Sequence, residues 1–182
     1  MTIDPRVRRI GFAVFEAAIL HDWGVRNVRS DVPASRVRRL LIPILVTMLD
    51  RHEPTVLLVP DVRSGAVRRS PYARETVNGI VREALDRGIV VCALTDGQVK
   101  AAFQQATGHK RPNKPQINAV IADWFRDLRP FVPKARRLWE PEGYFEPLFQ
   151  AVAQYCAWQG VPDVKRDSGD TDEVGRSRRK KA

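Results

Sequence analysis

An acid stands close to the start of the chain, followed directly by proline and arginine. In "IDPRVRRIGFAVFE", residues 3–16, Asp4 precedes an apolar segment rich in β-forming residues, so we expect its carboxylate at the edge of a sheet. A carboxylate in such a place can coordinate a hard cation such as Mg²⁺. An aspartate before proline also often caps a turn with its own side chain. The residues alone therefore leave both roles open for Asp4.

Further along the chain, basic stretches have the composition of phosphate-binding loops. They are "RSGAVRRSPYAR", residues 63–74, and "HKRPNKPQ", residues 109–116. Each leads into an expected helix, and the free N–H groups at a helix N-terminus favour a phosphate. The cationic residues expected to contact phosphate are Arg63, Arg68, Arg69, Lys110, Arg111 and Lys114. The competing interpretation is that both stretches are ordinary solvated loops.

The overall charge also indicates a polyanionic partner. The 182 residues include 31 Lys and Arg against 21 Asp and Glu, which gives a formal charge of +10 and a pI near 10.3. Such an excess attracts nucleic acid, although arginine-rich proteins of high-GC genomes show it too. Cys92 and Cys156 lie in apolar runs without the spacing of a metal site, which favours small buried side chains.

The chain is expected to form one domain followed by a tail. A hydrophobic fraction of 43% is enough for one core, and we assign it to residues 1–160. Residues 161–182 are polar and end in "RSRRKKA", which predicts a disordered basic arm. The chain has no apolar run of membrane-spanning length and no signal-peptide pattern, so we expect a cytoplasmic protein.

The elements that must position these residues follow from periodicity and turn signals. Strands are expected at 10–15, 55–62 and 89–94, with one or two more within 19–29. Helices are expected from Ser35, from Ser70-Pro71 to Gly88, from Asp96, from Pro115 and over 147–158. An antiparallel start followed by two βα units predicts an α/β three-layer domain with a mixed sheet.

Two of these stretches resemble motifs of a known family. "IDPRVRRIGFAV" is similar to the Asp-Pro-Gly and Gly-x-Ala-Val opening of the RuvC family of Holliday junction resolvases, with Arg6 at the place of the first glycine. "VKAAFQQATGHKRPNKPQINAVIADW", residues 99–124, resembles the resolvase signature. The matching residues there are Lys100, Thr107, Gly108, Lys114 and Gln116. The resemblance implies a ribonuclease H-like fold, whose mixed five-stranded sheet has three antiparallel strands, then two βα crossovers, with flanking helices.

The resemblance also implies an activity and its cofactor. It implies a metal-dependent, structure-selective endodeoxyribonuclease that acts on branched DNA such as Holliday junctions, in recombination and repair, as a homodimer. Catalysis would use two Mg²⁺ or Mn²⁺ ions. Asp4 occupies the place of the first metal-binding aspartate, and Arg6 would face the anionic substrate.

The other acidic positions of the family are not acidic in this chain. Pro60 stands where the resolvases carry a glutamate, while Pro147 and Gln150 stand at the aspartates of the last helix. Acids close to these places would have to substitute for them. The proposed catalytic and metal-binding set is therefore Asp4, Asp61, Glu142 and Glu146.

These departures keep other functions open. Pro60, Pro147 and Gln150 favour a nucleic-acid-binding protein that kept the fold and lost cleavage. A YqgF-like RNA-processing nuclease would have the same fold and a different substrate. An ATPase of the related actin-like fold would need a second glycine-rich phosphate loop, and the sequence shows none.

Overall fold

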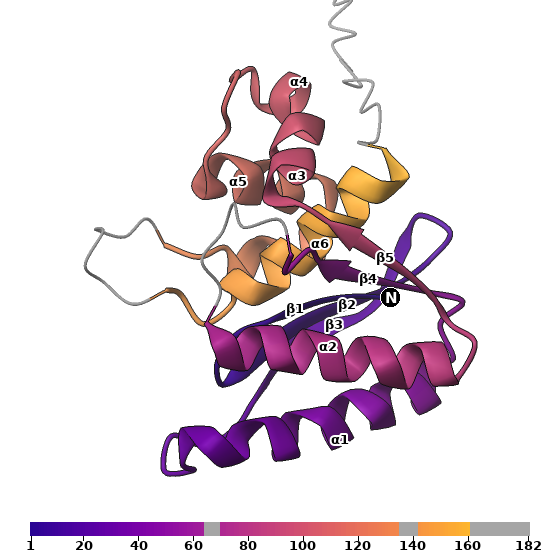
Figure 1. Cartoon of the computed structure of the whole chain (residues 1–182). Helices are drawn as coiled ribbons and strands as arrows, with labels where there is room; N and C mark the ends of the chain where they lie inside the picture. Colours follow the sequence, from indigo (N-terminus) through magenta and orange to yellow (C-terminus); the bar gives the residue numbers. More distant parts are fainter. Residues whose placement is uncertain (64–69, 135–141, 161–182) are drawn as a thin grey trace, which may run out of the picture.

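A single mixed sheet organises the fold. The structure is a computed structural model that describes residues 1–63, 70–134 and 142–160. The strands are β1 (Thr2–Pro5), β2 (Arg9–Glu16), β3 (Ile19–Asn27), β4 (Val56–Pro60) and β5 (Val90–Leu94), in the spatial order β3-β2-β1-β4-β5 (Figure 1). β1 to β3 pair antiparallel, whereas β4 pairs parallel to both β1 and β5. The sheet topology confirms the predicted five-stranded mixed sheet.

Asp4 lies in the middle of this sheet. It belongs to β1, the central strand, and pairs with Gly11 of β2. The expected position at the edge of a sheet is therefore wrong. The reason is that β1 is only four residues long and ends in proline, so no alternation was visible before the apolar segment that became β2. The region 19–29 forms only one further strand, β3.

Helices cover both faces of the sheet. α1 (Ala34–His52) and α2 (Pro71–Asp86) lie on one face (Figure 1). The other face carries α6 (Glu146–Gln159) together with α3 (Asp96–Ala102), α4 (Gln104–Thr107), α5 (Lys114–Trp124) and the 3₁₀ helix η1 (Arg126–Phe131). The predicted helices are all present, and Ser70 caps α2 by accepting a hydrogen bond from the Ala73 amide. α1 begins one residue before Ser35, after Pro33.

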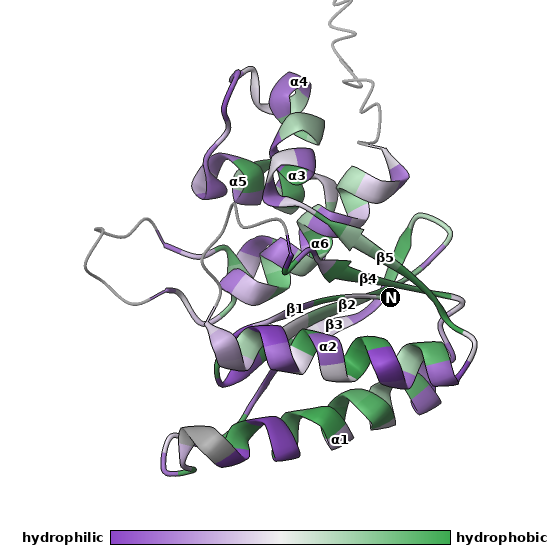
Figure 2. Cartoon of the chain, viewed as in Figure 1, coloured by the Kyte–Doolittle hydropathy of each residue, from purple (hydrophilic) through white to green (hydrophobic). Residues whose placement is uncertain are grey.

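The two faces of the sheet bury separate apolar clusters. Leu57 and Val59 of β4 pack with α1 and α2, while Leu58 between them packs with α3, α5 and α6. This alternation is what a strand covered on both faces requires, and β4 is coloured as strongly hydrophobic in Figure 2. Both α1 and α2 mix hydrophobic and hydrophilic residues along their length in Figure 2.

The structure bears on some of the expectations for the tail, for membrane-spanning segments and for the two cysteines. The tail expected at 161–182 lies outside the described residues, so its disorder stays a prediction. Among the described helices, none combines the length and the apolar character that crossing a bilayer would require. Cys156 is buried and Cys92 is half-buried, and both are free thiols.

Candidate active site

A glycine sets the distance between the sheet and the last helix. A Cβ added to Gly11 would lie 2.0 Å from the carbonyl carbon of Pro147 and 2.3 Å from the amide nitrogen of Leu148. Only a residue without a side chain permits this approach of β2 to the start of α6. Because Gly11 pairs with Asp4, the same contact brings the N-terminus of α6 beside Asp4.

Asp4 is held by an arginine two residues away. Its side chain is entirely buried, and its Oδ2 lies 2.7 Å from Nε of Arg6. Nη1 of Arg6 lies 3.5 Å from Oε2 of Glu142. Burial by itself would lower the pKa of the Arg6 guanidinium, but the charges of Asp4 and Glu142, with the hydrogen bond to Asp4, raise it. Arg6 therefore stays cationic between these acids.

A lysine makes the next link in the same cluster. Nζ of Lys114 lies 2.8 Å from Oε1 of Glu142 and 3.3 Å from Oε1 of Glu146. The carboxylate of Glu146 is buried and also accepts a hydrogen bond from Nδ2 of Asn118. Arg9 fixes the segment that carries Glu142, since its guanidinium donates to the carbonyls of Glu142 and Gly143. The acids from β1, from residue 142 and from α6 are thus joined through cations.

A pocket opens at the carboxyl ends of β4 and β5, next to Asp4. Its lining is mostly polar and comprises Asp4, Arg6, Pro60, Asp61, Leu94, Asp96, Val99, Lys114, Gln150 and Gln154. Asp61 follows β4, and its Oδ1 accepts a hydrogen bond from the amide of Arg63. Asp96 opens α3 after β5 and forms an ion pair with Lys100 at 2.6 Å. The pocket therefore collects side chains from five separate parts of the chain.

The structure brings the predicted acids into one region, but it places cationic side chains between them. Asp4, Glu142 and Glu146 are linked through Arg6 and Lys114, and Asp61 lines the pocket with Asp4. Among residues 1–63, 70–134 and 142–160, no three histidine, cysteine or acidic side chains are grouped closely enough to hold a metal ion. The predicted metal-binding set remains a prediction, and the cations between the acids are its most evident departure from expectation.

Comparison with known proteins shows which family this chain belongs to. The family model described as "Crossover junction endodeoxyribonuclease RuvC" matches residues 1–126. The chain belongs to the RuvC family. A curated member, the crossover junction endodeoxyribonuclease RuvC of Renibacterium salmoninarum, is 32% identical over 125 residues, which are 65% of this chain and 63% of that protein. Glu142 and Glu146 lie beyond the part of the chain that matches the family model.

Solved structures show the same fold. The RuvC structure of Thermus thermophilus has a TM-score of 0.57 at 18% identity and covers 85% of this chain and 89% of its own. The T. thermophilus RuvC in complex with Holliday junction substrate gives 0.58 at 18%, with 85% and 88% covered. The yeast mitochondrial Holliday junction resolvase gives 0.54 at 14%, with 86% and 77% covered. The predicted ribonuclease H-like fold of the RuvC family is thereby confirmed.

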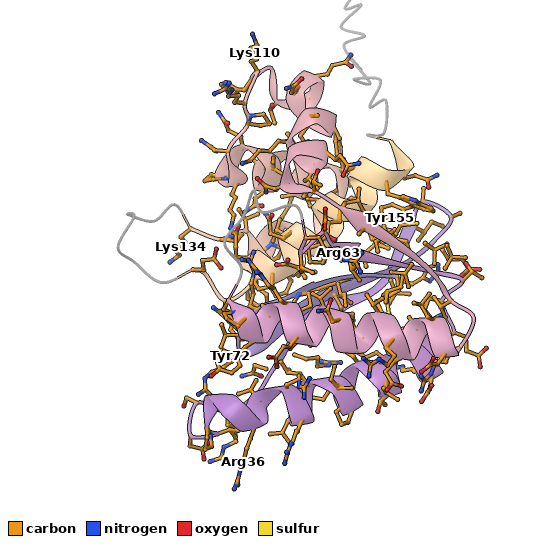
Figure 3. The ribbon with its side chains drawn as sticks, viewed as in Figure 1. Arg36, Arg63, Tyr72, Lys110, Lys134 and Tyr155 are labelled. Atoms are coloured by element: carbon orange, nitrogen blue, oxygen red, sulfur yellow. The ribbon has the colours of Figure 1, made fainter. Side chains whose placement is uncertain are left out.

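Within this RuvC-family fold, the basic residues divide into inner and outer groups. Arg6 and Lys114 line the pocket and form ion pairs with acids. Lys110 belongs to the connection between α4 and α5 and extends from it into solvent (Figure 3). Arg63 is exposed and lies much closer to the sheet in the same view. Arg111 is exposed beside Lys110. Arg68 and Arg69 lie outside the described residues.

The N-terminus of α5 offers a phosphate fewer amides than the sequence suggested. Asn113 and Gln116 form a reciprocal capping box, in which Oδ1 of Asn113 accepts from the Gln116 amide at 3.0 Å. Pro115 has no N–H to donate. Phosphate contact in this loop therefore depends on the side chains of Lys110 and Arg111 more than on the helix terminus.

Sequence reasoning did not select Asp96 or Gln154 for this site. Asp96 was interpreted only as a helix start, yet it follows β5, and the carboxyl ends of neighbouring parallel strands meet at one edge of a sheet. Gln154 lies eight residues after Glu146 and four after Gln150 on α6. That spacing places the three on one helix face and was the signal available to find it.

Proposed function

We propose that this chain is a structure-selective endodeoxyribonuclease that acts on branched DNA such as Holliday junctions. The observation that carries the proposal is the position of Asp4. It is buried on the central strand of a RuvC-family fold, at the place that the resemblance gives to the first metal-binding aspartate. Membership of a family whose curated relative is named a crossover junction endodeoxyribonuclease supports the substrate, and homodimeric action belongs to the same proposal.

The RuvC family generally depends on divalent metal ions, and the pocket has a feature that suits one. Oε1 of Gln154 is buried without a hydrogen-bond partner, and Gln154 lines the pocket with Asp4, Asp61 and Asp96. An amide oxygen beside carboxylates is a ligand that Mg²⁺ or Mn²⁺ accepts. A bound ion would supply an activated water and stabilise the leaving oxygen of the phosphodiester. Asp4, Asp61, Glu142 and Glu146 are the proposed acids around it.

In this proposal, some residues take part in the reaction and others bind the substrate. Asp4 anchors the reacting end of the pocket because it pairs with Gly11 of β2 and its strand also pairs with β4 through Thr2. Exposed cations along the rim would bind and orient the DNA backbone. The proposed set for this contact is Arg63, Arg68, Arg69, Lys110 and Arg111. Arg6 and Lys114 hold the acids in place and face the same pocket.

Cleavage of three labelled substrates tests this function. A four-way junction, a linear duplex and a structured RNA are incubated with Mg²⁺ or Mn²⁺ and either wild type or Asp4→Asn. We expect cutting of the junction by wild type alone. Asp31→Asn is the matched control, since it neutralises an exposed aspartate paired with Arg29 and should leave cutting unchanged. Preferential cutting of RNA would instead indicate a YqgF-like processing nuclease.

A second function is favoured by the ion pair between Arg6 and Asp4. If Arg6 never leaves that carboxylate, the chain recognises branched DNA through its basic rim without hydrolysing it. Salt-sensitive binding of the junction by both wild type and Asp4→Asn, with no cutting by either, would establish this alternative.

A further inference from the structure

The acids in and beside the pocket form ion pairs with two cationic side chains of the chain itself. Arg6 binds Asp4 and Glu142, and Lys114 binds Glu142 and Glu146. Arg6 places a positive charge between the carboxylates of Asp4 and Glu142, which a bridging cation would otherwise neutralise. Lys114 matches a residue of the family signature, whereas Arg6 stands where the family motif has glycine. A guanidinium that binds two carboxylates does so with directed N–H donors, a geometry that lysine or a hydrated ion cannot reproduce.

We propose that the Arg6 guanidinium takes the place of one of the two metal ions that the family resemblance implies, so that this chain binds a single divalent cation between Asp4 and Gln154. The inference rests on the proposed function for the identity of the site and deepens it by fixing the number of ions and one new ligand.

The side chain of Gln154 is the main evidence for the remaining cation. Its side chain is only 4% exposed, and its Nε2 donates to the carbonyls of Ile3 and Gln150 at 3.3 and 3.4 Å. Because both partners are acceptors, the amide nitrogen must face them, and this fixes the opposite direction for Oε1. That oxygen has no hydrogen-bond partner although it is buried, which costs free energy unless a cation or water satisfies it.

The position of Gln154 relative to Asp4 agrees with this role. The carbonyl that accepts from Gln154 belongs to Ile3, the residue directly before Asp4 on β1, and both Asp4 and Gln154 line the pocket. Arg6 and Lys114 connect Asp4 to Glu142 and Glu146, whereas Asp61 and Asp96 line the pocket from the ends of β4 and β5. The proposed cation therefore uses fewer acids than a two-ion site, consistent with the absence of a three-acid group among the described residues.

Counting bound ions tests the proposal without using catalysis. The full chain, stripped of metal, is titrated with Mn²⁺ and the stoichiometry is measured by calorimetry and by the electron paramagnetic resonance signal of free Mn²⁺. We expect one ion per chain for wild type and two for Arg6→Gly, the residue that the family motif carries. Arg29→Gly removes the same charge from an exposed side chain and should keep one ion. Two ions or none in wild type, or an unchanged count in Arg6→Gly, would overturn the proposal.

Two substitutions test the new ligand. Gln154→Glu should bind Mn²⁺ at least tenfold more tightly, and Gln154→Met, which lacks the oxygen, at least tenfold more weakly. Gln105→Glu adds the same charge at an exposed position and should not change the affinity. Unchanged affinity in folded Gln154→Met would remove Gln154 from the site, as circular dichroism in EDTA reports folding independently of metal.

Separate measurements distinguish failure of this proposal from failure of the proposed function. One bound Mn²⁺ in wild type with no cleavage of any substrate would preserve the cation site and reject the nuclease. Cleavage of the four-way junction with two bound ions would preserve the nuclease and reject the single-cation site.

Discussion

Nε of Arg6 lies 2.7 Å from Oδ2 of Asp4, and the side chain of Asp4 is entirely buried while that of Arg6 is 23% exposed. A buried carboxylate is stable only when hydrogen bonds and an opposite charge offset its loss of hydration. Arg6 supplies both from the adjoining turn, where its own amide donates to the carbonyl of Arg9. The central acid of this RuvC-family fold is therefore stabilised by the chain itself.

Removal of that cation should make stability depend more strongly on metal. We expect Arg6→Gly to lower the free energy of unfolding by about 3 kcal/mol in EDTA, because it removes the guanidinium that pairs with the buried Asp4 carboxylate. Each bound Mn²⁺ should add about 2.7 kcal/mol at a hundred times its dissociation constant, so Arg6→Gly with two ions should gain more than a variant with one. Urea unfolding with and without Mn²⁺ measures both effects. Arg29→Gly is the control, and equal metal dependence in both variants would contradict the prediction.

Substitution of Gly11 should separate the sheet from α6. The Cβ in Gly11→Ala would lie 2.0 Å from a backbone atom of Pro147, which cannot rotate away, so we expect a loss of about 3 kcal/mol by overpacking. Gly97→Ala is the matched control, since its Cβ would meet only Thr95 Oγ1 at an ordinary 3.8 Å. Thermal unfolding of both variants measures the difference, and similar midpoints would show that β2 and α6 can move apart.

The layered fold could be predicted because its elements carry strong local patterns. The apolar run that became β4, the capped start of α2 at Ser70-Pro71 and the periodic face of α5 each specify one element. β1 could not be recognised in this way, since four residues ending in proline show no period. The place of Asp4 at the centre of the sheet is set by the pairing of β1 with β2 and, at long range, with β4.

The candidate site was harder to predict than the fold for a physical reason. The acids Asp4, Asp61, Glu142 and Glu146 were selected by type and place, but the sequence does not show which charges neutralise one another. Arg6 was expected to face the substrate, which stays a prediction, and its ion pairs with Asp4 and Glu142 were not expected. An ion pair between residues far apart, such as Lys114 with Glu146, depends on how α5 and α6 pack.

DNA binding should lose salt dependence when the outer cations are removed. Lys110 projects from the end of the molecule opposite to Arg36 of α1 (Figure 3). If Lys110 contacts a phosphate, Lys110→Ala should lower the slope of log Kobs against log salt by about one, with a uniform loss of affinity across sequences. Fluorescence anisotropy with a labelled junction in EDTA at several salt concentrations measures the slope. Arg36→Ala removes one charge from the far side, and an equal change in that variant would indicate a general effect of charge.

The two cysteines should differ strongly in reactivity. Burial raises the pKa of the Cys156 thiol to about 12, and this side chain on α6 is only 1% exposed. Since the thiolate is the reactive form, a raised pKa lowers its fraction at pH 8 by about a thousandfold relative to an ordinary thiol with a pKa of about 8.5. We expect iodoacetamide to modify Cys92 first in the folded protein and to modify both cysteines in urea, as measured by peptide mass spectrometry. Raising the pH from 7 to 9 should leave the reaction of Cys156 slow. Equal modification of both thiols in the folded protein would show that α6 opens readily from the sheet.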